Sequence, residues 1–230
     1  MKLGPLTWLG WIFVVFVTLV VPWAVLRNRG SAIAMASIPL GERFVSMLMP
    51  QVFLGLLAVG TGFIEKIELF PWRVPEQQAW LSGLLFLGIS ILLVRPHWRR
   101  SVEEQKPTWR LFAPTNKREG AMWVALSVSA GIAEELVWRG ALPALLLTLT
   151  GSMPLALVLA IASFAIAHAI QGLRSVLAIA TIAASFHALV MISGSLYVAM
   201  AVHFIYDVIA GFTYAKFARE LGLLRDPAHG

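Results

Sequence analysis

Two adjacent glutamates and an arginine lie inside one of the most apolar stretches of this chain, and they are the first candidates for chemistry. Ionisable side chains at membrane depth cost free energy, so they usually mark functional positions. Glu135 and Arg139 stand at i and i+4, which is the spacing and order of an ion pair on one helix face. Glu134 points about 100° away from Glu135 around a helix and lacks that partner, which suits a general base. The alternative is that both glutamates brace Arg139 between helices.

Two later segments place histidines at helical spacing from an aromatic ring and from a carboxylate. Phe164 and His168 are four residues apart, and so are His203 and Asp207. A carboxylate beside a histidine fixes the tautomer of the imidazole, as in many hydrolytic and metal sites. Such a pair also satisfies two buried polar groups, so by itself it fits either role. His187 has no carboxylate three or four residues away, and we expect it to be structural. The polar segments fall on different predicted helices, which can converge on one point of a bundle.

Several kinds of active site are excluded by composition. The chain has no cysteine, which excludes thiol catalysis and cysteine-bound metal. Its two aspartates are Asp207 and Asp226, and the second lies in the tail, so a pair of membrane aspartates is excluded. No His-Glu-x-x-His segment is present, so a zincin site is excluded too. Glu134, His168 and His203 could hold zinc as a two-histidine, one-carboxylate set, and the sequence neither demands nor forbids this.

The elements that must position these residues follow from composition. Of the 230 residues, 59% are hydrophobic and 13% are charged, and a typical soluble domain carries about twice that share of charge. The apolar residues form uninterrupted blocks long enough to cross a bilayer as helices, which excludes the alternation of a barrel. The sequence therefore predicts an all-α, polytopic transmembrane helix bundle of about seven spans, within a range of six to eight. The candidate spans are 6–26, 45–64, 77–95, 119–150, 153–170, 173–192 and 195–218.

The distribution of charge predicts how the chain crosses the membrane. The net charge is +6, and we attribute the surplus to basic loops under the positive-inside rule rather than to a nucleic-acid partner. That rule places the N-terminus outside and the C-terminus in the cytoplasm. The basic 96–118 loop is expected to lie on the headgroups as a solvated linker. The 119–150 segment would exceed 40 Å or so as one helix, so it tilts, protrudes or breaks near Gly131 or Gly140. We divide the chain into a three-span scaffold with its basic loop (1–118), a catalytic bundle (119–218) and a polar tail (219–230).

In this order, the motifs Glu134-Glu135-x-x-x-Arg139, Phe164-x-x-x-His168 and His203-x-x-x-Asp207 resemble those of the CPBP (Abi) family of intramembrane proteases, which includes the type II CAAX prenyl endopeptidases. The resemblance spans about residues 119–210 and implies hydrolysis of a peptide bond within the membrane. It implies that Glu134, helped by His168, activates the attacking water. It also implies that His203 and Asp207 stabilise the oxyanion, while Glu135, Arg139 and Phe164 organise the site.

One position departs from the family pattern. The last motif often ends in asparagine, and here it ends in Asp207. An amide can donate to an oxyanion, whereas an ionised carboxylate cannot, so Asp207 is either protonated or serves only to orient His203. The resemblance requires no cofactor and leaves zinc open. It implies a plasma-membrane protein whose partners are membrane lipids and a membrane-anchored or lipidated substrate. The alternatives are a non-catalytic immunity or scaffold protein and a proton-coupled transporter.

Overall fold

Helices account for almost all of the structure. The structure, a computed structural model, describes residues 5–70 and 74–224, apart from the side chains of residues 32, 33, 108, 173 and 174, and these stretches contain no strand. In chain order the elements are α1 (Trp8–Val15), η1 (Phe16–Val20), α2 (Val21–Arg27), α3 (Arg29–Met35), α4 (Leu40–Ile64), α5 (Gln77–Glu103), η2 (Pro107–Leu111), α6 (Lys117–Glu135), η3 (Leu136–Ala141), α7 (Leu142–Thr150), α8 (Met153–Ala167), η4 (Ala169–Gln171), α9 (Leu173–Ser193) and α10 (Leu196–Glu220).

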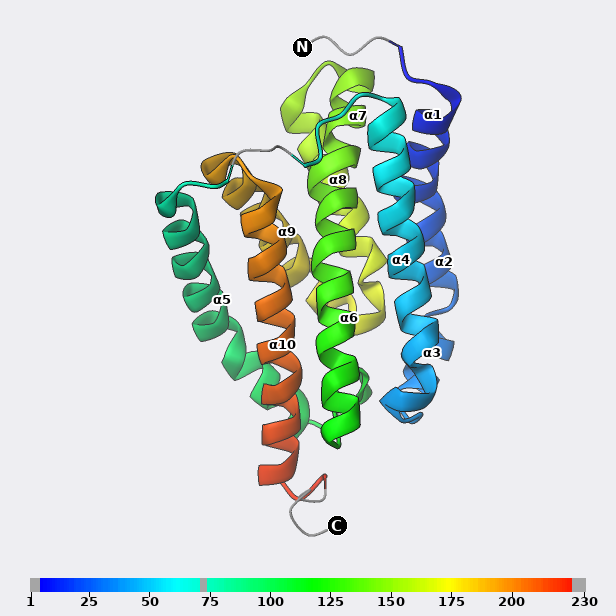
Figure 1. Cartoon of the computed structure of the whole chain (residues 1–230). Coiled ribbons are helices and arrows are strands. Elements are labelled where there is room, and N and C mark those ends of the chain that lie inside the picture. The colour runs from blue at the N-terminus through cyan, green and yellow to red at the C-terminus, as the bar shows by residue number, and fades with distance from the viewer. Residues whose placement is uncertain (1–4, 71–73, 225–230) are drawn as a thin grey trace.

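The predicted polytopic helix bundle is confirmed. Within the described residues, six helical stretches are long and apolar enough to cross a membrane, and α8 is a shorter apolar helix of 15 residues. At about 1.5 Å per residue, α8 reaches only about 22 Å, less than the hydrocarbon core of about 30 Å. Figure 1 shows that α1 begins at one end of the bundle and α10 finishes at the other. Which end faces the cytoplasm stays a prediction.

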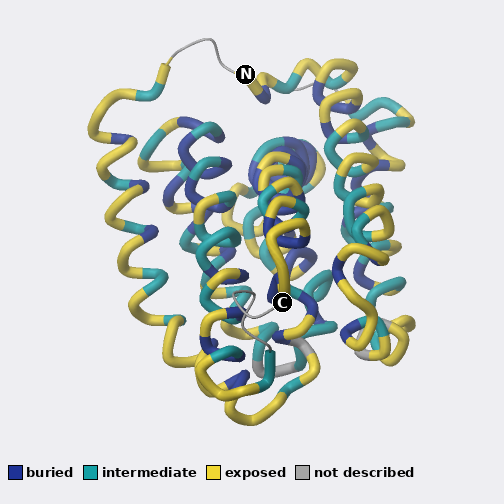
Figure 2. Tube along the Cα trace, turned by 60° about the horizontal axis from the view of Figure 1, so that its bottom comes forward, coloured by how far each residue is buried: buried dark blue, intermediate teal, exposed yellow. Residues whose placement is uncertain are grey.

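The bundle has a buried centre and an outer layer that faces lipid. In the continuous 117–150 stretch 56% of the apolar window is buried, whereas in α4 and α5 the share is 17%. Large apolar side chains such as Phe63, Leu92 and Ile192 point outward and are mostly exposed. Figure 2 shows exposed positions along the outside of the bundle and buried positions inside it. The helix that carries the two glutamates is therefore the central one.

The last helices are joined by two turns of the same design. Gly151 follows α7 and Gly194 follows α9, and both adopt the left-handed conformation that lets a helix end abruptly. A serine comes next in each case, and its hydroxyl accepts a hydrogen bond from the first turn of the following helix. These two-residue turns require α7 and α8, and then α9 and α10, to run antiparallel beside each other.

Two π-helical turns stand just before helices whose second residue is proline. Proline has no N–H and its ring crowds the carbonyl four residues earlier, and a wider turn relieves that contact. In η1 the N–H of Val21 bonds to the carbonyl of Phe16, so the carbonyl of Val17 loses its usual donor. The hydroxyl of Ser163 donates to that carbonyl at 2.8 Å, and the Trp138 indole donates to Ser163 at 3.1 Å. This relay connects the first span to the helices of the site.

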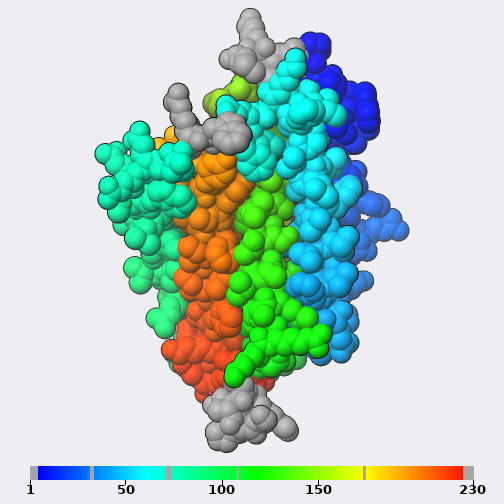
Figure 3. Space-filling model, in the orientation of Figure 1, coloured from blue at the N-terminus to red at the C-terminus, as the bar shows by residue number. Residues whose placement is uncertain are grey.

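Three helices, α4, α6 and α10, lie side by side on one face of the molecule, as Figure 3 shows. Glycines allow them to touch. A Cβ atom on Gly131 of α6 would lie 2.9 Å from the backbone nitrogen of Phe204 and 3.0 Å from the carbonyl of Met200, both in α10. On the other side of α6, a Cβ atom on Gly55 of α4 would lie 3.2 Å from the Cβ of Ala133. The 117–150 stretch stays continuous through Gly131 and Gly140, and η3 occupies the second of these regions.

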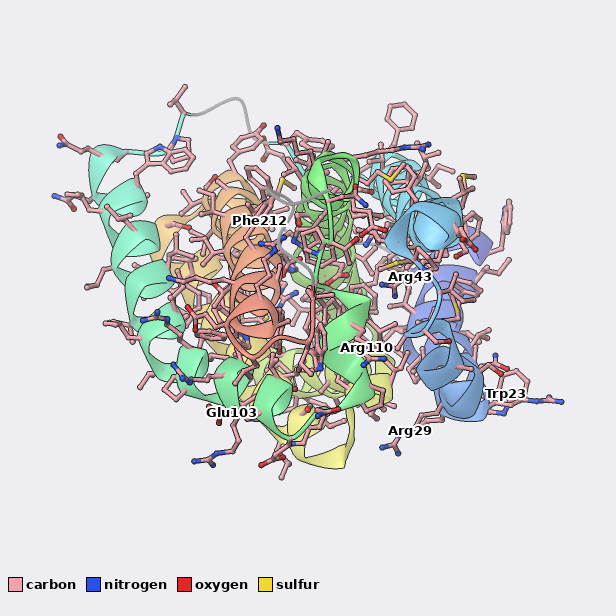
Figure 4. The ribbon with its side chains drawn as sticks, turned by 90° about the horizontal axis from the view of Figure 1, so that it is seen from below. Trp23, Arg29, Arg43, Glu103, Arg110 and Phe212 are labelled. Atoms are coloured by element: carbon pink, nitrogen blue, oxygen red, sulfur yellow. The ribbon has the colours of Figure 1, made fainter. Side chains whose placement is uncertain are left out.

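The expectation of a solvated 96–118 linker is wrong. Helix α5 continues to Glu103, and Trp98 and Trp109 are buried in a cluster with residues of α10. The guanidinium of Arg43, in α4, donates to the carbonyls of Arg110 and Leu111 at 2.6 and 3.1 Å. Figure 4 shows Arg43 and Arg110 at the end of the bundle where α6 begins. The tryptophans have apolar partners and a buried arginine binds the turn, so the segment packs against the bundle, and its position at the headgroups stays a prediction.

Candidate active site

A cavity of about 210 Å³ lies inside the bundle, and all three motifs contribute to its wall. Its lining residues are Met47, Gln51, Trp98, Phe112, Trp123, Leu126, Ser127, Ala130, Glu134, Arg139, Phe164, His168, Gln171, Ile179, Ile182, Phe186, His203, Tyr206, Asp207, Ala210 and Tyr214. Glu134 stands near the middle of the 117–150 stretch, about 25 Å from either end. The chemistry-bearing end of the cavity is therefore within the bundle and far from both ends of its central helix.

Glu134 lies between two histidines from other helices. Its Oε2 atom is 3.8 Å from Nε2 of His168 and 3.8 Å from Nε2 of His203. The carboxylate is only 16% exposed, and no salt bridge to Lys or Arg is found for it within the described residues. The distances are too long for direct hydrogen bonds but suit a water molecule shared between the groups. The carboxylate without a cationic partner is thus the one that faces both imidazoles.

Glu135 is fully buried and serves two cations or donors at once. Its Oε1 atom is 3.3 Å from Nη1 of Arg139, in the i, i+4 ion pair that the spacing predicted. The same oxygen accepts a hydrogen bond from Nδ1 of His203 at 2.8 Å. This second contact joins α6 to α10 across 68 residues of sequence. A buried carboxylate needs such partners, so the hydrogen bond both stabilises the charge of Glu135 and fixes the ring of His203.

Two phenyl rings hold Arg139 in place. Its guanidinium carbon lies 4.3 Å from the ring centre of Phe164 and 5.2 Å from that of Phe186. Aromatic faces attract a cation, most strongly where water is excluded. Phe164 also contacts the imidazole of His168 at 4.4 Å between ring centres, and Phe186 contacts that of His203 at 5.4 Å. The two rings therefore fix the arginine and both histidines of the site relative to one another.

The end of α8 sets the position of His168. The helix stops at Ala167, and His168 and the short turn η4 lead to Gly172, whose φ of 104° reverses the chain. The Nδ1 atom of His168 is 2.8 Å from the carbonyl of Phe164. A carbonyl can only accept, so Nδ1 carries a proton, and Nε2 is the nitrogen that faces Glu134 and the cavity. The short length of α8 thus places an imidazole at membrane depth.

Asp207 does not hold the tautomer of His203. It lies 3.6 Å from Nε2, the nitrogen that also faces Glu134, whereas Nδ1 is held by Glu135. The sequence-based suggestion that Asp207 orients the ring therefore gives way to orientation by Glu135. The i, i+4 spacing placed Asp207 on the right helix face but could not show which ring nitrogen it would meet. His187 is buried at 5% exposure and is absent from the cavity wall.

Residues of the first half of the chain also line the cavity, which sequence reasoning missed. Met47 and Gln51 come from α4, Trp98 from α5, and Phe112 from the turn before α6. Gln51 carried a usable signal, because a polar side chain in an apolar span is unusual. The proposed division at residue 118 stays a prediction, and the walls of the cavity cross it.

The zinc set that the sequence left open, Glu134, His168 and His203, stays a prediction. Within 5–70 and 74–224, no group of three or more histidine, aspartate and glutamate side chains is arranged to hold a metal ion. Glu134, His168 and His203 are close together, and Nδ1 of each imidazole is engaged by a carbonyl or by Glu135, so Nε2 is the nitrogen that faces Glu134 in both rings. No step of the reaction proposed below uses a metal.

The model of the Rce1-like family, described as type II CAAX prenyl endopeptidase Rce1-like, matches residues 117–209. No curated protein and no solved structure gives a significant match to the chain. The matched segment begins at the first residue of α6 and includes Glu134, His168 and His203. Residues 117–209, which carry all three motifs, are similar to the Rce1-like family of type II CAAX prenyl endopeptidases, and the resemblance inferred from those motifs is confirmed at the level of the family model.

Proposed function

We propose that this protein is an intramembrane endopeptidase in which Glu134 activates water for attack on a peptide bond. The observation that carries the proposal is the position of this carboxylate, 3.8 Å from one nitrogen each of His168 and His203, on the wall of a cavity inside the bundle. A hydrolase within a membrane needs a sheltered polar site, a base, and donors for the developing negative charge. The family match over the same residues supports this reading.

Glu134 and His168 hold the attacking water between them. With Nδ1 of His168 donating to the carbonyl of Phe164, Nε2 accepts a hydrogen bond from the water. Glu134 accepts the other hydrogen and takes that proton as the water oxygen bonds to the scissile carbonyl carbon. Two acceptors on one water orient its lone pair toward the substrate, which lowers the entropic part of the barrier.

His203 stabilises the oxyanion that forms. Its Nδ1–H donates to Glu135, so the ring is fixed, and its Nε2 faces the cavity beside Glu134. When the ring carries both protons, Nε2–H donates to the tetrahedral oxyanion. Asp207 lies 3.6 Å from that nitrogen, and its carboxyl group can donate to the same oxyanion only in the protonated form. The intermediate then collapses: the carbon–nitrogen bond breaks, Glu134 returns its proton to the leaving amine, and a carboxylic acid and an amine are released.

The substrate class follows from the family name and from the other end of the cavity. From the site, the wall continues along α10 to Tyr214 and includes Trp98, Phe112, Trp123 and Tyr206, all aromatic. Such a wall suits an apolar chain or side chains more than charged ones. We therefore assign as substrate a membrane-anchored or lipidated peptide, of which a prenylated CAAX protein is one case, presented within a plasma membrane.

The test is turnover of a prenylated CAAX peptide by the purified protein in detergent or vesicles. Glu134→Gln and His168→Ala are expected to lower kcat by about 10²- to 10⁴-fold, the range for loss of general-base catalysis. Glu76→Gln and His97→Ala are the matched controls, because both residues are exposed and neither lines the cavity, and they should retain full turnover. Undiminished turnover in both site variants would overturn the proposal. The same holds if Glu134→Gln preserved a cellular phenotype that deletion of the protein abolished.

A further inference from the structure

Gln51 is a polar residue of the cavity that none of the three motifs contains. It lies in α4, outside the family-matched residues 117–209. In sequence this helix belongs to the half of the chain that we interpreted as scaffold. Its side chain nonetheless lines the same cavity as Glu134, His168 and Arg139. The family match therefore says nothing of Gln51, and its role is argued from its position and its side-chain amide.

The packing of α4 on α6 brings Gln51 close to the reacting end of the cavity. Gly55 lies one helical turn further along α4, on the same face, and it packs against Ala133 of α6. A Cβ atom added to Gly55 would lie 3.2 Å from the Cβ atom of Ala133. Ala133 immediately precedes Glu134. Since Gln51 and Gly55 share a face and Gly55 touches α6, Gln51 points along α6 toward the turn that contains Ala130 and Glu134, and all three line the cavity.

The amide of Gln51 is not satisfied by the rest of the protein. Its Oε1 atom is buried and has no hydrogen-bond partner within the described residues. A buried acceptor without a donor is destabilising, and an apolar side chain at position 51 would avoid that cost. The Oε2 atom of Glu134 lies 3.8 Å from one nitrogen of each of the two histidines. On the described cavity wall, Gln51 is a neutral residue whose buried acceptor has no donor from the protein.

A carboxamide has the hydrogen-bonding groups of a peptide bond. Its oxygen accepts from one N–H and its nitrogen donates to one C=O, so it pairs with a peptide group without carrying charge. Within a site that already holds several carboxylates, a neutral residue binds the main chain without adding to the repulsion near Glu134. We propose that Gln51 is a substrate-binding residue that accepts a hydrogen bond from one main-chain N–H of the bound peptide. This inference rests on the proposed function, since it takes the ligand to be a peptide.

The first test separates binding from chemistry. Gln51→Met keeps the length of the side chain and removes its amide. The variant should raise KM for a prenylated CAAX peptide about three- to tenfold, the effect of one lost neutral hydrogen bond, with kcat unchanged because the contact is equal in ground and transition states. Gln77→Met is the matched control, since Gln77 is exposed at the start of α5, and its KM should equal that of the wild type. An unchanged KM in Gln51→Met would overturn the proposal.

The second test identifies the hydrogen bond and does not need cleavage. Affinity is measured in a Glu134→Gln background for a series of the same peptides in which one amide at a time is replaced by an ester, which removes one N–H. One ester position should weaken binding about three- to tenfold when Gln51 is present and not at all in Gln51→Met, as a double-mutant cycle requires. Equal losses in both backgrounds at every position would overturn the proposal. If the wild type cleaves no peptide but the coupling is found, the proposed hydrolysis fails and the role of Gln51 in binding stands.

Discussion

A single methyl group added to Gly131 should separate the two halves of the site. In Gly131→Ala the new Cβ would lie 2.9 Å from the backbone nitrogen of Phe204, well inside the 3.4 Å of ordinary contact. The obstacle is backbone, which cannot rotate away as a side chain can. Helices α6 and α10 must therefore move apart by about 0.5 Å, or the strain must stay in the structure.

The size of the effect depends on the hydrogen bond between α6 and α10 that lies next to this contact. Glu135 lies one turn beyond Gly131, and His203 directly precedes Phe204. A separation of about 0.5 Å would lengthen the 2.8 Å hydrogen bond between His203 and Glu135 to about 3.3 Å. Overpacking of this kind costs about 1–3 kcal/mol. In a protein of this size that lowers Tm by about 2–12 °C. Since a misplacement of about 1 Å can cost 10²-fold in rate, we expect kcat to fall about tenfold.

The assay combines thermal unfolding in detergent with turnover of the prenylated peptide at a temperature where both proteins are folded. Gly60→Ala in α4 is the matched control, because an added Cβ there meets no atom within 4 Å, and helix propensity should leave its Tm equal or higher. The reasoning is refuted if Gly131→Ala keeps both the Tm and the kcat of the wild type. A fall in Tm without any loss of kcat would refute the link between helix separation and the site.

Three further predictions concern the buried ion pair, Asp207 and the effect of metal removal. Glu135→Leu and Arg139→Met should each lower stability by about 3–5 kcal/mol, because each removes one partner of a buried ion pair, while the double variant loses much less; thermal unfolding of the four proteins checks this, and additive losses would contradict it. Asp207→Asn should retain or raise kcat, because an amide at 3.6 Å from His203 can also donate to the oxyanion; a tenfold loss in steady-state turnover would show that the carboxylate is needed. Dialysis against a chelator should leave turnover unchanged, because the described residues form no ligand set for a metal; restoration of lost activity by added zinc would show otherwise.

Local spacing predicted those features of the site that depend on one helix. The ion pair of Glu135 with Arg139 follows from i, i+4 geometry, and the structure places the two groups 3.3 Å apart. The isolation of Glu134 from that pair follows from the same periodicity. The membrane-spanning helices were predictable because lipid forces backbone hydrogen bonds to close within each segment, so length and hydrophobicity decide the outcome.

Contacts between distant segments could not be predicted in this way. The hydrogen bond of Glu135 with His203 joins residues 68 positions apart. The binding of Arg43 to the carbonyls of Arg110 and Leu111 turned an expected surface loop into a packed segment. In both cases the partner is a backbone group or a ring nitrogen whose position depends on how helices pack, and residue type alone does not specify it.

The sequence by itself determined which side chains can do chemistry here and that they lie on membrane helices or, for His168, directly after one, because charge in an apolar segment is costly and rare. It also determined that Glu135 and Arg139 pair, since both sit on one helix. Only the tertiary structure decided that His203 is held through Nδ1 by Glu135, that the short α8 ends where His168 meets Glu134, and that Gln51 of α4 faces the same cavity. Those outcomes depend on the close approach of α6 to α10 and α4, which glycines at a few positions permit.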